Sequence, residues 1–196
     1  MSGHAQRVTS IKGASILARL DYIRDAHGIE TLDRVLESLE SADRELLSGS
    51  VLPSQAYALE LNGRLDVAIA SIVAPDKDQA LVFRELGRAS AERNLTSIHS
   101  IFLTGHDPHD LLRKYPAVRR TYYSDGVATY EWIDASRGVL RVRGAVSHTQ
   151  ADCESTAGYY ERALALVGVD DPRVDLRCRT SPSGTCEYHC SWRLTD

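Results

Sequence analysis

The spacing of apolar positions divides the chain into a helical first part and a mixed second part. From residue 14 to about residue 125, apolar residues recur every three or four positions, as in amphipathic helices. Beyond Gly126 the spacing falls to two, in the segments VATYEWID and GVLRVRGAV, which is typical of strands. The pattern predicts helices first and a sheet afterwards.

The helical part is expected to contain several short helices and one long one. Gly28 is a candidate C-cap, and Pro116 should interrupt or kink the last helix of this part. The polar residues 1–12 are expected to be frayed. The small residues Gly87, Ala89, Ser90 and Ala91 in the long helix should let another helix approach closely. The expected helices cover residues 14–28, 29–40, 41–49, 54–72, 79–103 and 107–125.

The second part predicts two β-hairpins with a helix between them. The first hairpin turns at ASRG and the second, formed by RVDLRCRT and TCEYHCSWR, turns at SPSG. A helix from Thr149 or Asp152 to Val167 separates the two hairpins. N-terminal helices followed by β-β-α-β-β imply an α+β fold, in which a small antiparallel sheet packs against helices.

Bulk properties exclude some functions. The chain has 196 residues, 43% apolar residues and a formal charge of -4, so it fits one domain and lacks the basic excess that binds nucleic acid. It shows no secretory leader and no run of roughly 20 apolar residues, so we expect a cytoplasmic protein without a membrane span. In that reducing compartment, clustered cysteines favour metal binding, redox chemistry or burial over disulfides.

All four cysteines lie between Asp152 and Trp192. Cys186 and Cys190 share a strand face but would be about 13 Å apart, too far to bind one zinc ion together. Cys186 should face Cys178 across the second hairpin, and Cys153 could form a third corner. A fourth ligand would come from Asp175, Glu154 or water. Buried structural thiols, or a reactive Cys153 at a helix start, are the alternatives.

Aromatic residues gather around the expected junction of helices and sheet. They could line an apolar pocket with polar tips, or pack in the core. The histidines His106 and His109, at a helix start, are expected in a surface loop. The aromatic candidates for ligand binding are Tyr115, Tyr122, Tyr123, Tyr130, Trp132 and Tyr159.

The cysteine-bearing segments ADCESTAGYYERAL, DLRCR and GTCEYHCSW resemble the 4-vinyl reductase domain. This ligand-binding module belongs to a superfamily of nitric-oxide signalling and Golgi transport proteins, which includes vesicle-tethering subunits and, more remotely, haem nitric-oxide sensors. The resemblance covers roughly residues 78–194. The whole chain, with FRELGRASAERNLTSIHSIF and DPHDLLRKYPAVRRTYYSDG, is also similar to a bacterial paralogous family of unknown function built on that domain.

The resemblance implies a structural zinc ion held by Cys153, Asp175, Cys178 and Cys186. Asp175 stands where the family has a glutamate, and it lies three residues from Cys178, hence on the opposite strand face unless the strand has a bulge. Cys190 is outside the pattern. Haem is expected to be unlikely, because no histidine matches a proximal ligand and the YxSxR motif of the haem sensors is absent.

Together these observations predict a non-enzymatic protein that binds a hydrophobic or aromatic small molecule, or that regulates a partner. The resemblance places the pocket between the 79–103 helix, the 107–125 helix and the sheet, and implies a homodimer and a downstream protein partner. A helical region (1–77) and a ligand-binding domain (78–196) would form one compact unit. A zinc- or cysteine-dependent enzyme, or a structural homodimeric adaptor, remains as an alternative, and the ligand's identity stays open.

Overall fold

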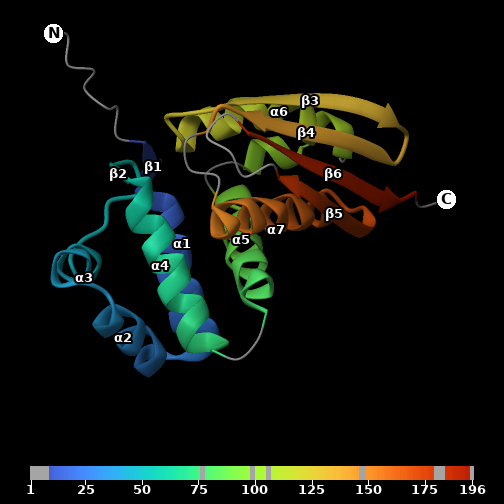
Figure 1. Cartoon of the computed structure of the whole chain (residues 1–196). Coiled ribbons are helices and arrows are strands. Elements are labelled where there is room, and N and C mark those ends of the chain that lie inside the picture. The colour runs from blue at the N-terminus through green and yellow to red at the C-terminus, as the bar shows by residue number, and fades with distance from the viewer. Residues whose placement is uncertain are drawn as a thin grey trace, which may run out of the picture.

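The computed structural model describes residues 9–75, 78–97, 100–104, 107–145, 149–178 and 184–194. N-terminal helices lie beside a second unit in which helices pack on a sheet (Figure 1). The helices are α1 (Gly13–His27), α2 (Ile29–Ser38), α3 (Ser41–Ser48), α4 (Leu59–Val73), α5 (Gln79–Leu95), α6 (Pro108–Tyr122) and α7 (Gln150–Leu166), with a 3-10 turn at Ser100–Leu103. No helix among the described residues is both long enough and apolar enough to cross a membrane.

The main sheet has four antiparallel strands in the order β3-β4-β6-β5. Each expected hairpin supplies two neighbouring strands, and β4 pairs with β6 to join the hairpins. The sheet therefore confirms the predicted α+β fold, although the SPSG turn falls largely outside the described residues. The strands are β3 (Val127–Asp134), β4 (Arg137–Arg143), β5 (Asp170–Cys178) and β6 (Thr185–Arg193).

Close contact between α5 and α7 joins the two parts of the protein. A Cβ atom on Gly87 would lie 1.8 Å from the carbonyl oxygen of Ser155, and one on Gly158 would lie 2.0 Å from that of Arg84. Only glycine permits this approach of one backbone to the other. The small residues of α5 thus do admit a second helix, as predicted, and that helix is α7.

Three expected boundaries are wrong. Residues 10–12 are not frayed: they form β1 (Ser10–Lys12), which pairs with β2 (Ala56–Ala58). This pairing delays the start of the expected 54–72 helix to Leu59. The long helix ends at Leu95 rather than Leu103, where the hydroxyl of Thr96 donates to the carbonyl of Glu92 and so competes with helix propagation. Pro116, in contrast, lies inside an α6 that continues past it.

The core has two main clusters. The first lies among α1, α2, α4 and α5 and includes Leu65 and Leu86, each fully buried. The second lies between α7 and the sheet and includes Tyr160 and Tyr188. Since α5 contributes to the first cluster and contacts α7, residues 1–77 share a core with the rest of the chain.

Candidate functional site

Arg19 of α1 is the centre of a buried polar network. Its Nε donates to Asp66 Oδ1 at 2.6 Å and its Nη2 to Asp66 Oδ2 at 3.2 Å, a bidentate pair. The other N–H groups donate to the Ser15 carbonyl and to the hydroxyls of Ser90 and Ser155. All five guanidinium donors are therefore satisfied. Burial acts against the charge, but attraction to Asp66 raises the pKa of Arg19, so the cation persists.

A second polar pair lies where α6 meets α7. The hydroxyl of Tyr123 donates to Asp152 Oδ1 at 3.2 Å. Burial raises the pKa of Asp152 to about 6, although the charge of Arg119 and the Tyr123 hydrogen bond oppose the shift. The Arg119 guanidinium lies over the Tyr123 ring, 4.5 Å from its centroid. Asp152 is therefore a carboxylate that can change protonation near neutral pH.

A large cavity, here called the outer cavity, opens between α4 and the first turns of α5 and α7. Its volume is about 710 Å³. Asp66 and Asp152 are among its lining residues, together with Asn62, whose buried Oδ1 has no hydrogen-bond partner among the described residues. Asn62 Nδ2 donates to Asp66, and this bond fixes the orientation of the amide. The Oδ1 atom, an acceptor, is therefore the one without a partner in the described part of the chain. Apolar side chains complete the walls: Leu39, Leu59, Val67, Ala68, Phe83 and Ala151.

A much smaller inner cavity lies between α1, α5, α6 and α7. It holds about 30 Å³, room for one or two water molecules. Four of the six aromatic candidates, Tyr115, Tyr122, Tyr123 and Tyr159, line it, as do Arg19 and Arg119. The two cavities are neighbours, because the pairs Arg19–Asp66 and Tyr123–Asp152 each have one member in the lining of each cavity.

The remaining two aromatic candidates lie elsewhere. Tyr130 and Trp132, on β3, gather around His109 of α6, which stacks on Trp132 with centroids 4.5 Å apart. The His109 ring nitrogens contact the Tyr130 hydroxyl and the Ala135 carbonyl. His109 is 6% exposed, so the expected surface loop is wrong for it, and His106 lies outside the described residues. The structure thus separates the six aromatic candidates into two groups.

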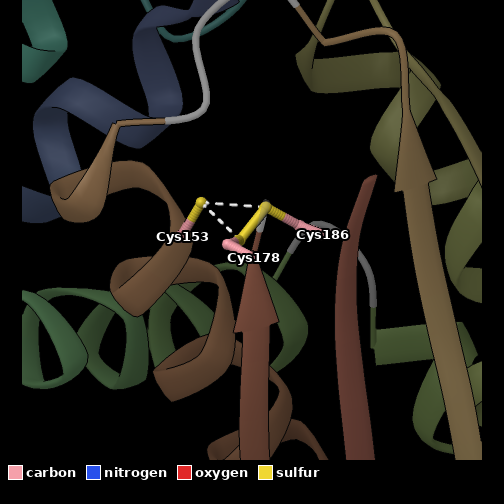
Figure 2. A group of neighbouring side chains, drawn as sticks. All are labelled: Cys153, Cys178 and Cys186. Atoms are coloured by element: carbon pink, nitrogen blue, oxygen red, sulfur yellow. Dashed lines mark hydrogen bonds between the residues drawn. A yellow bond between two sulfur atoms is a disulfide. The ribbon is translucent and has the colours of Figure 1, made fainter. Parts of the chain in front are cut away.

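Three cysteines meet at the start of α7 (Figure 2). Cys178 and Cys186 are register partners on β5 and β6 and are joined by a disulfide, contrary to the expected preference for reduced thiols. The Cys153 Sγ lies 3.0 Å from the Cys178 Sγ and 3.2 Å from the Cys186 Sγ. Burial, aided by the charge of Asp152, raises the pKa of Cys153 to about 12. The predicted meeting of these three cysteines is thus present.

The fourth residue of the expected zinc set does not join them. Asp175 is exposed and pairs in register with His189, whereas the Cys178 side chain points inward. The group of three thiols, with all sulfurs within 4.8 Å, contains no carboxylate. The structure therefore shows a cysteine cluster but not a zinc site. Cys190 packs separately in the core beside Tyr188.

The Arg19 network was not among the expectations from the sequence. Its members come from four helices, and Arg19 and Asp66 are 47 positions apart. A local signal did exist: Asn62 and Asp66 lie one turn apart on α4, among its apolar positions, and polar residues there need a buried partner. This local pattern predicts a buried polar network, but it does not identify the residues of the other helices that take part.

The sequence matches, over residues 33–193, the family described as "Protein of unknown function (DUF2378)". The chain belongs to this family. No curated protein has a sequence that matches it significantly. This membership agrees with the expected family of unknown function.

Solved structures with the same fold include H-NOX domains. One, titled "Probing the function of heme distortion in the H-NOX family", has a TM-score of 0.73 and 12% identity, covering 95% of this chain and 97% of its own. The Fe(II) unliganded H-NOX protein from K. algicida has a TM-score of 0.69 and 13% identity, with 94% and 98% covered. An oxygen-binding H-NOX domain, related to soluble guanylate cyclases, has a TM-score of 0.67 and 10% identity, with 94% and 96% covered.

These matches correct two expectations from the sequence. The fold is that of H-NOX domains over nearly the whole chain, so the 4-vinyl reductase resemblance of residues 78–194 describes it only loosely. The expected cofactors, zinc rather than haem, are also wrong: the solved structures that share this fold include one whose title names haem, and the described residues show no zinc site. The expected homodimer has no support in the structure or in these matches.

Proposed function

We propose that this protein is a small-molecule-sensing module that binds its ligand in the outer cavity. The observation that carries this proposal is the cavity itself, because about 710 Å³ lies within the range of roughly 300–1,000 Å³ typical of ligand sites. Its mixture of apolar walls and a few polar groups is also typical of such sites. The H-NOX likeness supports a sensing role, since an H-NOX structure is described as oxygen-binding.

The lining residues favour a ligand with an apolar body and a hydrogen-bond-donating end, best an amine. Leu59, Val67 and Phe83 would contact the apolar body. Asp152 and Glu60 supply acceptors, while Arg64, which also lines the cavity, is bound to Asp43 at 2.6 Å. An ammonium group would therefore meet two carboxylates that form no salt bridge among the described residues, whereas a carboxylate ligand would be repelled.

Ligand binding in the outer cavity would reach the rest of the protein through its two polar pairs. A cation beside Asp152 competes with the Tyr123 hydroxyl for the same carboxylate. Tyr123 directly follows α6, which contacts β3, so a changed Tyr123 contact would shift α6 against the sheet. We propose the inner-cavity tyrosines Tyr115, Tyr122 and Tyr159 as the residues that respond, and a partner protein as the receiver.

The fold likeness to H-NOX domains raises the question whether the residues of either cavity suit a haem. The inner cavity offers phenol groups and arginines, which can ligate iron or pair with carboxylates, but its space of about 30 Å³ does not admit a haem. The outer cavity has the space, but its lining, among the described residues, has no histidine, cysteine, tyrosine or methionine. A haem does not fit either cavity as it is arranged, so the proposed chemistry rests on the protein's own side chains.

Ligand binding can be tested with a matched amine and acid, tryptamine and indole-3-acetate. At a concentration of 100 times Kd, a ligand stabilises the fold by about 2.7 kcal/mol, which raises Tm by roughly 5–10 °C for a chain of this length. We expect tryptamine to raise Tm and indole-3-acetate to leave it unchanged. The variant V67W should weaken the effect by narrowing the cavity, whereas V127W, on β3 and outside the cavity lining, should keep it.

Two results would overturn the proposal. Equal stabilisation by the acid and the amine would contradict the proposed ligand chemistry, and an undiminished effect in V67W would place the ligand elsewhere. Hemin is titrated in parallel, with the Soret band as the readout. Stoichiometric haem binding that survives V67W would replace amine sensing in the outer cavity by a haem-based function.

A further inference from the structure

The three-cysteine cluster combines one disulfide with one free thiol in contact with both of its sulfurs. Cys153 comes from the first turn of α7, and its sulfur lies 3.0 Å and 3.2 Å from those of Cys178 and Cys186. A thiolate displaces one sulfur of a disulfide by attacking the other sulfur along the line of their bond, so exchange requires Cys153 to shift from its position beside both sulfurs to the far side of the attacked one. The proposed ligand site makes no use of this arrangement.

The burial of the three sulfurs gives exchange a direction. Cys186 is 0% exposed and Cys153 is 3% exposed, whereas Cys178 is only half-buried and borders a surface cavity with Arg143 and Arg177. A departing thiolate is better accommodated where water and positive charge are near. Attack on Cys186, which releases Cys178, is therefore favoured over attack on Cys178, which releases the fully buried Cys186.

We infer that Cys153, Cys178 and Cys186 form a thiol–disulfide exchange site, in which the bond passes from the Cys178–Cys186 pair to Cys153–Cys186. Cys153 gives its proton to solvent base and its thiolate attacks the Cys186 sulfur. The new sulfur–sulfur bond forms as the old one breaks, and Cys178 leaves as a thiolate that takes up a proton. One disulfide and one thiol are present before and after, so no outside oxidant or reductant is needed.

Exchange would change which elements are tied together. The Cys178–Cys186 bond joins two strands that are already paired, whereas a Cys153–Cys186 bond fixes α7 to β6. Ala151 and Asp152, directly before Cys153, line the outer cavity. An effect of exchange on ligand binding would rest on the proposed function, but the exchange itself does not.

The chain allows a direct test by peptide mapping, because trypsin places the cysteines on separate peptides. Cys153 falls on residues 144–162, Cys178 on residues 178–179, and Cys186 with Cys190 on residues 180–193. Full-length protein is incubated between pH 7 and pH 10, quenched in acid, alkylated and digested without reductant. We expect the Cys153-linked peptide to increase with pH, with a matching increase in alkylated Cys178.

Variants separate exchange from unrelated oxidation. C178S oxidised with diamide should form the Cys153–Cys186 bond, C153S should keep the Cys178–Cys186 bond at every pH, and C190S should behave as the parent protein. The inference is overturned if the parent shows no Cys153-linked peptide at any pH, or if the linkage in it involves Cys190. The measurement on the parent decides the matter even if C178S fails to fold. It uses no ligand, so its outcome is independent of ligand binding in the outer cavity.

Discussion

The hydroxyl of Tyr123, just after α6, donates to the carboxylate of Asp152 in the first turn of α7, at 3.2 Å. This bond connects two helices that also pack together through Tyr115 and Tyr160, whose ring centroids lie 4.4 Å apart, and its acceptor lines the outer cavity. The protonation of a single side chain therefore bears on stability and on ligand binding.

Asp152 should make stability depend on pH. Its pKa is about 6 in the folded protein against 3.8 ordinarily, so between these values the folded state binds more protons than the unfolded state. The contribution of Asp152 to the free energy of unfolding should therefore fall as pH rises from about 4 to about 6, and it should stay low above pH 6. The substitution D152N removes this pH-dependent contribution to the free energy of unfolding, which amounts to about 3 kcal/mol when Asp152 is fully ionised. Urea unfolding gives the free energy of unfolding of D152N minus that of the parent. This difference should be more positive at pH 8 than at pH 4.5.

The control for this prediction is D175N, at an exposed carboxylate on β5. D175N should shift the unfolding free energy little, and by similar amounts at the two pH values. A D152N effect that is the same at both pH values would contradict the assigned pKa shift.

Removal of Arg19 should strongly destabilise the fold. R19A leaves the fully buried Asp66 without its bidentate partner, and an uncompensated buried charge costs about 3–5 kcal/mol. R24A provides a matched arginine on the same helix, half-exposed and paired with Asp21, where the expected loss is about 1 kcal/mol or less. Urea unfolding measures both. A loss below about 1 kcal/mol in R19A would show that the network is not formed.

The contact of α5 with α7 can be tested with two glycines. G87A places a Cβ atom 1.8 Å from the Ser155 carbonyl oxygen, so the helices must separate, and we expect a loss of about 1–3 kcal/mol or more. G63A, inside α4, meets nothing within 4 Å and should stabilise the protein by about 0.5–1 kcal/mol through helix propensity. Thermal unfolding should give opposite signs of change in Tm, and equal signs would contradict the packing.

Two tyrosines of the inner cavity should respond differently to loss of the hydroxyl. The buried Tyr159 hydroxyl has no hydrogen-bond partner among the described residues, so Y159F should be neutral or slightly stabilising. Y123F removes a hydrogen bond to Asp152, so it should lose about 1–3 kcal/mol at pH 8, where the carboxylate is charged. Unfolding free energies that change equally in the two variants would contradict this distinction.

The sequence by itself determined the type and order of the longer elements, but not the short strands β1 and β2. Local spacing of apolar residues is enough to distinguish the helices of residues 13–73 from strands such as 127–134, because each type has its own period. The predicted hairpin placed Cys178 opposite Cys186, and the rise along the strand separated Cys190 from them. The two-residue period raised the doubt about Asp175, which the structure places on the outer face.

Only the tertiary structure decided which distant side chains meet. Arg19 finds Asp66 through the packing of α1 against α4, and Tyr123 finds Asp152 through the position of α7. All of the aromatic candidates looked alike in the sequence. Tyr115 and Tyr159 line the inner cavity, whereas β3 places Tyr130 and Trp132 around His109. Such pairings depend on how helices and strands pack, which the local period does not encode. The sequence could therefore propose the cysteine cluster, while the cavities and their polar wall came from the fold.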